Sequence, residues 1–209
     1  MKSYFTFCTI FVSLICLQLS CKKNTTEVKH EQPKEIEYFP NAIGSWWKYE
    51  RYDSLNGIRD TVTATIVDTT TFADGSKMKI WKYTSNIDST LEQDYYYAGI
   101  RNDTLRFISP YQYGFRYPLP LKVGIITDTQ FDSLHVIQID SLTITSGIFD
   151  STYQIYFSLM CGDECSQESR LWFAPTIGFV KINHSLINWP FEFRKEFWQL
   201  LSYHLVPPK

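Results

Sequence analysis

Cys161 and Cys165 form the sharpest local cluster of reactive side chains, in the segment Cys161-Gly162-Asp163-Glu164-Cys165. In an extended strand, residues four apart lie roughly 13 Å from each other, whereas a disulfide needs Cα atoms within about 7 Å. A bridge therefore needs a turn, which Gly162 and Asp163 can supply. We predict a disulfide that closes a hairpin. A redox-active pair is the alternative, but thioredoxin-type motifs place two intervening residues at the start of a helix.

The histidines could supply acid–base or metal chemistry only if the fold brings them together. They are His30, His135, His184 and His204. The sequence contains no HExxH pair, no GxSxG elbow and no glycine-rich phosphate loop. A hydrolase built from dispersed Asp, Ser and His residues, or a convergent zinc site, would need one of the last three histidines beside a serine or a carboxylate. We assign no catalytic residue, no metal ligand and no cofactor.

Asp is followed by Ser or Thr at six places that could suggest a carboxylate-rich cation site. Asp and Ser side chains also bond to nearby backbone and are favoured in turns, so we interpret these pairs as turns. The pairs are Asp68-Thr69, Asp88-Ser89, Asp128-Thr129, Asp132-Ser133, Asp140-Ser141 and Asp150-Ser151.

The N-terminus has the layout of a secretory signal. Lys2 precedes an apolar, uncharged run over residues 4–19, which is short and wrongly flanked for a transmembrane helix. A small residue, Cys21 and two lysines follow, and this arrangement resembles a bacterial lipobox cleaved before Cys21, with Gln18 where the common pattern has Leu. We predict acylation of Cys21, by palmitate for example, and hence attachment to a membrane. A plain signal peptide cleaved nearby would instead leave Cys21 as an ordinary thiol.

The composition is that of a folded protein with an aromatic-rich core. Of 209 residues, 44% are hydrophobic, 20% are charged and 17% are aromatic. The net charge of −2 argues against a nucleic-acid partner. Of the 5 cysteines, Cys8 and Cys16 lie in the signal and Cys21 carries the lipid, which leaves the pair that an oxidising periplasm favours.

The chain divides into three parts. We predict a signal peptide over residues 1–20, the lipidated Cys21 and a flexible tether over 21–35, and one β-rich domain over 36–209. The tether is polar and mixed in charge, and when fully extended it would reach roughly 45 Å from the lipid.

Side chains of alternating polarity predict strands through most of the domain. Trp47, Tyr49 and Arg51 alternate with Trp46 and Lys48, and the Asn56-Gly57 pair that follows predicts a tight hairpin turn. Further alternating runs occupy residues 61–66, 77–83, 91–98, 105–108, 136–144 and 153–159, and three more strands are expected over 170–175, 178–182 and 196–206. The last of these would also fit a helix face, and we favour a strand because aromatic residues suit sheets.

An aromatic, proline-bearing stretch interrupts the alternation over residues 109–124. Because proline cannot donate to a ladder, we predict a loop or a sheet edge there. The stretch could serve as a contact loop for a partner through Tyr111, Tyr113, Phe115 and Tyr117. Trp46, Trp47 and Trp172 could likewise line a ligand pocket, although large rings more often fill the core of a sheet.

Two sequence blocks resemble a broad group of uncharacterised Bacteroidetes-type envelope lipoproteins. The first, over residues 38–49, reads Tyr-Phe-Pro, then a glycine, then Trp-Trp-Lys-Tyr. The second, over residues 171–181, reads Leu-Trp-Phe-Ala-Pro, two residues, then Gly-Phe-Val-Lys. The resemblance implies an all-β fold, mainly an antiparallel meander. The meander would form a lipocalin-like or half-open barrel, and the fold would allow one short helix. It implies no reaction.

These observations lead to a non-enzymatic binding or scaffold module at the cell envelope as the first hypothesis. Its partner would be an apolar small molecule, held in a cup formed by the sheet, or an envelope protein. An accessory subunit of an outer-membrane assembly and a hydrolase are the alternatives. Residues 22–26 lack the acidic run that accompanies surface export in such lipoproteins, so we expect an outer-membrane location facing the periplasm.

Overall fold

The computed structural model describes residues 38–88, 95–108, 114–128, 132–162, 165–188 and 191–207. The predicted signal, Cys21, the tether, Tyr111 and Tyr113 lie outside these residues. Within the described residues, no helix is long and apolar enough to cross a bilayer.

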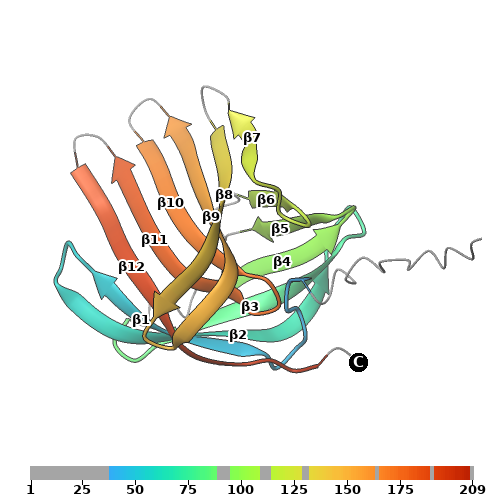
Figure 1. Cartoon of the computed structure of the whole chain (residues 1–209), viewed down its shortest axis with the longest axis horizontal. Coiled ribbons are helices and arrows are strands. Elements are labelled where there is room, and N and C mark those ends of the chain that lie inside the picture. The colour runs from blue at the N-terminus through green and yellow to red at the C-terminus, as the bar shows by residue number, and fades with distance from the viewer. Residues whose placement is uncertain are drawn as a thin grey trace, which may run out of the picture. The chain divides into compact units, whose positions relative to one another are not determined.

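Every element that the described residues form is a β-strand, so the all-β prediction is confirmed (Figure 1). The strands are β1 (Trp46–Asp53), β2 (Ile58–Thr71), β3 (Lys77–Ser85), β4 (Tyr95–Arg101), β5 (Thr104–Ile108), β6 (Gly114–Pro118), β7 (Gly124–Asp128), β8 (Asp132–Ile144), β9 (Gly147–Gly162), β10 (Cys165–Ala174), β11 (Gly178–Asn188) and β12 (Phe191–His204). The ambiguous last segment is a strand, as we favoured.

The strands form one antiparallel sheet in the order β6-β5-β4-β3-β2-β1-β12-β11-β10-β9-β8-β7. Neighbours in the chain pair with each other, as in a meander, except that β1 pairs with β12, with Arg51 opposite Trp198. The consecutive strands β6 and β7 therefore lie at the two edges. Within the described part of the chain they do not pair, so the sheet is open, as a half-open barrel would be.

The sheet bends until distant strands touch. Phe107 of β5 and Phe179 of β11, far apart in the strand order, have ring centroids 6.2 Å apart. Phe39, which precedes β1, lies between the two halves with its ring centroid 6.0 Å from Trp81 and 6.1 Å from Phe173. The face that bears Trp47 therefore encloses the core, and we call it the inner face.

Alternation decides which side chains reach this inner face. Trp47, Tyr49 and Arg51 of β1 are buried, whereas Lys48 and Glu50 between them are exposed. On β2, every second residue from Asp60 to Ile66 is buried. Buried rings remove about 150–250 Å² each from water, so the aromatic inner face supplies the main drive to fold.

The turns differ in detail from the sequence prediction. The Asn56-Gly57 pair does join β1 to β2, but only Gly57 of the two has positive φ, at 67°, because the loop spans four residues. The Asp53 carboxylate instead accepts hydrogen bonds from the backbone of Leu55 and Asn56. Two consecutive positive φ angles, 48° and 54°, occur at Asn102-Asp103 between β4 and β5.

Some of the Asp-Ser and Asp-Thr pairs lie within strands, where the turn prediction was wrong. Asp68-Thr69 falls inside β2, and Asp140-Ser141 and Asp150-Ser151 fall inside β8 and β9. The ladder between β8 and β9 passes from the Ile139–Thr152 pair to the Ser141–Asp150 pair. Ser151, which it skips, has a φ of 55°, so a local irregularity takes the place of a turn.

Candidate functional site

Arg51 lies at the centre of a buried ionic cluster on the inner face. Its Nε and Nη2 donate to both oxygens of Asp60, at 2.7 and 2.8 Å, which is a bidentate pair. Its Nη1 donates to Glu196 Oε1 at 3.2 Å, and Nη2 also donates to Asp88 Oδ2 at 3.0 Å. The side chains of Asp60 and Glu196 are 0% and 6% exposed, so these charges are screened little by water.

Neighbouring side chains hold the carboxylates of this cluster. Ser85 donates its hydroxyl to Asp60, and Trp198 Nε1 donates to Glu196 Oε2 at 3.1 Å. Burial by itself would lower the pKa of Arg51, but its hydrogen bonds to Asp60 and the charge of Glu196 outweigh burial and raise it. Arg51 therefore stays protonated, and we call Arg51, Asp60, Asp88 and Glu196 the inner ionic cluster.

Aromatic rings border the inner ionic cluster. The Arg51 guanidinium carbon lies 5.9 Å from the ring centroid of Trp198, and that ring contacts Tyr49 and Tyr83 edge-on at 5.9 and 6.0 Å. The Tyr49 hydroxyl donates to the Phe179 carbonyl oxygen at 2.8 Å. Burial raises the pKa of Tyr49 and of Tyr83, so both hydroxyls stay neutral at physiological pH.

Ser169 of β10 and His184 of β11 form a second polar contact on the strands that follow β12 in the sheet order, and we call them, with Glu196, the polar row. The Ser169 hydroxyl lies 2.9 Å from His184 Nδ1, and sheet register places His184 opposite Glu196. Ser169 is buried. A hydroxyl beside an imidazole, with a carboxylate on the following strand, is a donor set that acid–base chemistry can use.

The other described histidines lie outside this row. His135 Nε2 lies 2.8 Å from the Ser133 hydroxyl on β8, where both side chains alternate with inward-facing Leu134. His204 stacks on Trp46 at a centroid distance of 6.2 Å. Among the described residues, no group of three His, Cys, Asp or Glu side chains is arranged to hold a metal ion.

The three tryptophans that we considered for a ligand pocket occupy different places. Trp47 is buried in the core, stacks on Trp81 at 4.6 Å and donates from Nε1 to the Ile177 carbonyl oxygen at 2.6 Å. Trp46 is half-buried on the opposite, outer face. Trp172 is buried and packs with the core cluster, although it alternates with the inner residues Leu171 and Phe173, and Lys181 Nζ lies 4.6 Å from its ring centroid.

Only part of the predicted contact loop is described. Tyr117 of β6 is buried in the core, and its neighbour Phe115 is described in backbone only. The side chains of Cys161 and Cys165 are also outside the described residues. Their strands β9 and β10 pair antiparallel there, with Cys165 opposite Gly162, and the disulfide stays a prediction.

Sequence reasoning placed Arg51 in an alternating strand but missed its partners. A charged residue in the same register as Trp47 and Tyr49 was a usable signal, because a buried arginine needs a carboxylate. Asp60 lies one residue before the alternating run predicted over residues 61–66 and shares the register of its apolar residues Val62 and Ala64. Glu196 carries no comparable signal, since it lies 145 residues from Arg51 in the chain.

No family model and no curated protein matches this sequence. Among solved structures, a protein from Bacteroides fragilis NCTC 9343, named as exported and with a YmcC-like fold, aligns with a TM-score of 0.44 and 13% identity. That alignment covers 80% of this chain and 99% of the other. A protein from Parabacteroides distasonis ATCC 8503, named as a lipoprotein, aligns with a TM-score of 0.36 and 14% identity over 79% of this chain and 97% of the other. These similarities are too distant to assign an activity.

Proposed function

We propose that this chain is a lipoprotein of the cell envelope and that it acts as a non-enzymatic binding module. In this proposal an acylated Cys21 anchors the chain in the outer membrane, facing the periplasm, and the polar tether separates the β domain from the bilayer. The support for the anchor is the apolar N-terminal run that ends at Cys21. The support for the binding role comes from the way in which the inner face is filled.

The inner ionic cluster is the observation that carries the binding role. A charged side chain that binds a substrate must be able to give up its partners within the protein. Arg51 already forms ion pairs with three carboxylates. Elsewhere on the inner face, the rings of Trp47 and Trp81 pack face to face. Because Arg51 is already paired and these rings pack on each other, we infer that partners are met mainly by the outer surface of the sheet.

Metabolic labelling tests the anchor. Cells that express the chain are grown with an alkyne analogue of palmitate, and the purified protein is examined for label and by intact mass. We expect label on the wild type and none on Cys21→Ser, with Cys16→Ser as the matched control that keeps it. An unlabelled wild-type chain, or label that survives Cys21→Ser, would contradict the proposal.

Native mass spectrometry tests how the module binds. A module that meets partners through its surface should have the mass of the lipidated chain alone. A carrier of an apolar small molecule would instead retain a second lipid of defined mass, which organic extraction would release. An accessory subunit of an outer-membrane assembly would be recovered by cross-linking in one complex with an envelope protein.

A hydrolase is the second candidate, and the 2.9 Å contact between Ser169 and His184 favours it. The imidazole could accept the hydroxyl proton while Ser169 attacks an ester. A fluorophosphonate probe reports such a serine by covalent labelling. Labelling of the wild type that disappears in Ser169→Ala, but persists in Ser133→Ala, would replace the non-enzymatic proposal, and an unlabelled wild type would remove the hydrolase.

A further inference from the structure

The outer face of the sheet carries a row of aromatic and cationic side chains on neighbouring strands. Sheet register places Tyr52 opposite both Arg59 and Phe197, and it places Arg170 opposite Tyr156. Asn183 of β11 joins the two groups, because it lies opposite Phe197 and Arg170. We call this row the outer strip, and in order across the sheet it contains Arg59, Tyr52, Phe197, Asn183, Arg170 and Tyr156.

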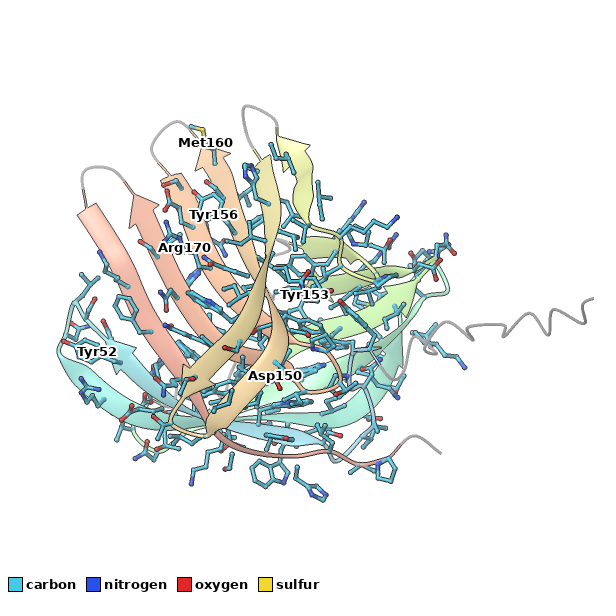
Figure 2. The ribbon with its side chains drawn as sticks, viewed as in Figure 1. Tyr52, Asp150, Tyr153, Tyr156, Met160 and Arg170 are labelled. Carbon is cyan, nitrogen blue, oxygen red and sulfur yellow. The ribbon has the colours of Figure 1, made fainter. Side chains whose placement is uncertain are left out.

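Each cation of this region is supported by an aromatic ring. The Arg59 guanidinium carbon lies 4.4 Å from the Tyr52 ring centroid. That of Arg170 lies 5.8 Å from the Tyr156 centroid, and Figure 2 labels Arg170 and Tyr156. Lys181, beside the strip, lies over Trp172. A ring attracts the positive group without using its N–H hydrogens, so the donors stay oriented and available to an anion.

Two of these three cations have no carboxylate partner among the described residues. Within the described structure, Arg170 and Lys181 form no ion pair, although Glu168 lies two residues before Arg170 on the same face. Arg59 has only a long 4.0 Å contact with Glu50, and both side chains are about half exposed or more, at 63% and 49%. The outer strip itself contains two cations, Arg59 and Arg170, and no carboxylate, on a chain whose net charge is −2.

The shape of this positive region favours a linear partner. The outer strip follows one row of paired residues from β2 to β9, which at about 4.8 Å per strand is roughly 24 Å long. Phe197 is 38% exposed in its middle, and an exposed ring can pack against the apolar face of a sugar. A row of cations and rings therefore matches a chain of charged sugars better than it matches a flat bilayer surface.

We propose that the outer strip binds a linear anionic polysaccharide, with Arg59, Arg170 and Lys181 donating to its carboxylate or sulfate groups. The inference gives the proposed binding module a surface and a partner class, and it rests on that proposal only for the location at the envelope. Tyr52, Phe197 and Tyr156 hold the cations or pack against the sugar rings.

Equilibrium binding of polygalacturonate to the full chain in nonionic detergent tests the proposal. The chain carries Cys21→Ser throughout, so the result does not depend on the anchor. For the double variant Arg170→Ala/Lys181→Ala we expect affinity to fall by about tenfold or more, because charge-assisted hydrogen bonds are lost. Lys77→Ala is the matched control, since Lys77 is exposed at the start of β3, and its affinity should stay within about twofold. Neutral dextran should not bind.

Three results would overturn the proposal. The first is a wild-type chain that does not bind polygalacturonate, or that binds dextran equally well. The second is an equal loss of affinity in Lys77→Ala and in the double variant. The third is sedimentation with phosphatidylglycerol vesicles that requires Arg170 and Lys181 while polygalacturonate is not bound, which would assign the strip to a membrane surface. Matching near-ultraviolet circular dichroism of all variants ensures that folded proteins are compared.

Discussion

Each face of the sheet has an arginine beside an aromatic ring, but the two arginines have different surroundings. On the inner face, Arg51 lies 5.9 Å from the Trp198 ring, and on the outer face, Arg170 lies 5.8 Å from the Tyr156 ring. Arg51 is buried and bonded to carboxylates, whereas Arg170 is exposed and forms no ion pair within the described structure. Surroundings, and not the cation–ring contact, therefore decide whether an arginine stabilises the fold or is available to a partner.

The largest effect should come from removing the inner cation. Arg51→Met leaves Asp60 and Glu196 buried without it, and we expect a loss of about 3–5 kcal/mol in the free energy of unfolding. Urea unfolding followed by tryptophan fluorescence measures this loss. A variant within about 0.5 kcal/mol of the wild type would show that the inner ionic cluster is not structural.

The outer face is not exposed to solvent everywhere. At Gly99 of β4, neighbouring residues of β3 leave no room for a side chain. A Cβ at Gly99 would lie 2.5 Å from Met78 Sδ and 2.8 Å from the Lys77 carbonyl oxygen, and Met78 is itself buried. Because a backbone atom is one of the obstacles, Gly99→Ala should cost about 1–3 kcal/mol of stability. Thermal unfolding measures this cost. An unchanged midpoint would mean that Met78 and the Lys77 backbone shift aside without a loss of stability.

Tyr49 gives the stability of the inner face a pH dependence. Burial raises the pKa of Tyr49 in the folded chain, while the unfolded chain ionises near pH 10. The stabilisation is therefore fully present below about pH 10 and is lost as pH rises further, because the unfolded state releases the proton more readily.

Tyr49→Phe separates this effect from the hydrogen bond to Phe179. At pH 7 the variant should be about 1 kcal/mol less stable, since it lacks the hydroxyl donor. Above about pH 10 its stability should decrease less steeply than that of the wild type. Urea unfolding at several pH values measures both differences, and parallel curves for the two proteins would contradict the assignment.

The smallest effect on stability is expected for the outer cations. Arg170→Ala/Lys181→Ala removes the exposed Arg170 and the partly buried Lys181, neither of which has a carboxylate partner in the described structure, so the free energy of unfolding should change by less than about 1 kcal/mol. The urea midpoint measures this. A loss similar to that of Arg51→Met would mean that the outer cations are structural as well.

The sequence predicted the inner and outer faces better than the contacts on them. Alternation placed Trp47, Tyr49 and Arg51 on one face because neighbouring side chains in a strand point to opposite sides. The pairing of β1 with β12 joins the two ends of the domain, and no local pattern encodes it. The contact between Arg51 and Glu196 was therefore not predictable.

The Ser169–His184 contact shows how a single residue limits such prediction. The turn between β10 and β11 pairs Ala174 with Gly178, and continuing this register would place Ser169 opposite Asn183. A bulge between Trp172 and Phe173 shifts the register by one residue, so that His184 lies opposite Ser169 instead. Because a one-residue shift reverses the faces, the pair depends on a bulge that the sequence does not announce.

The central claim is that the outer cations are available to bind a polymer, whereas Arg51 on the inner face is paired with carboxylates and stabilises the fold. The salt dependence of polysaccharide binding tests this claim most directly. Affinity for polygalacturonate is measured over a series of salt concentrations for the wild type and for Arg170→Ala/Lys181→Ala. We predict that the wild-type affinity falls steeply with salt, as expected when cations displace counterions from a linear polyanion, and that the double variant has a clearly shallower slope. Equal slopes would contradict the account, because the two cations would then make no contact with the polymer.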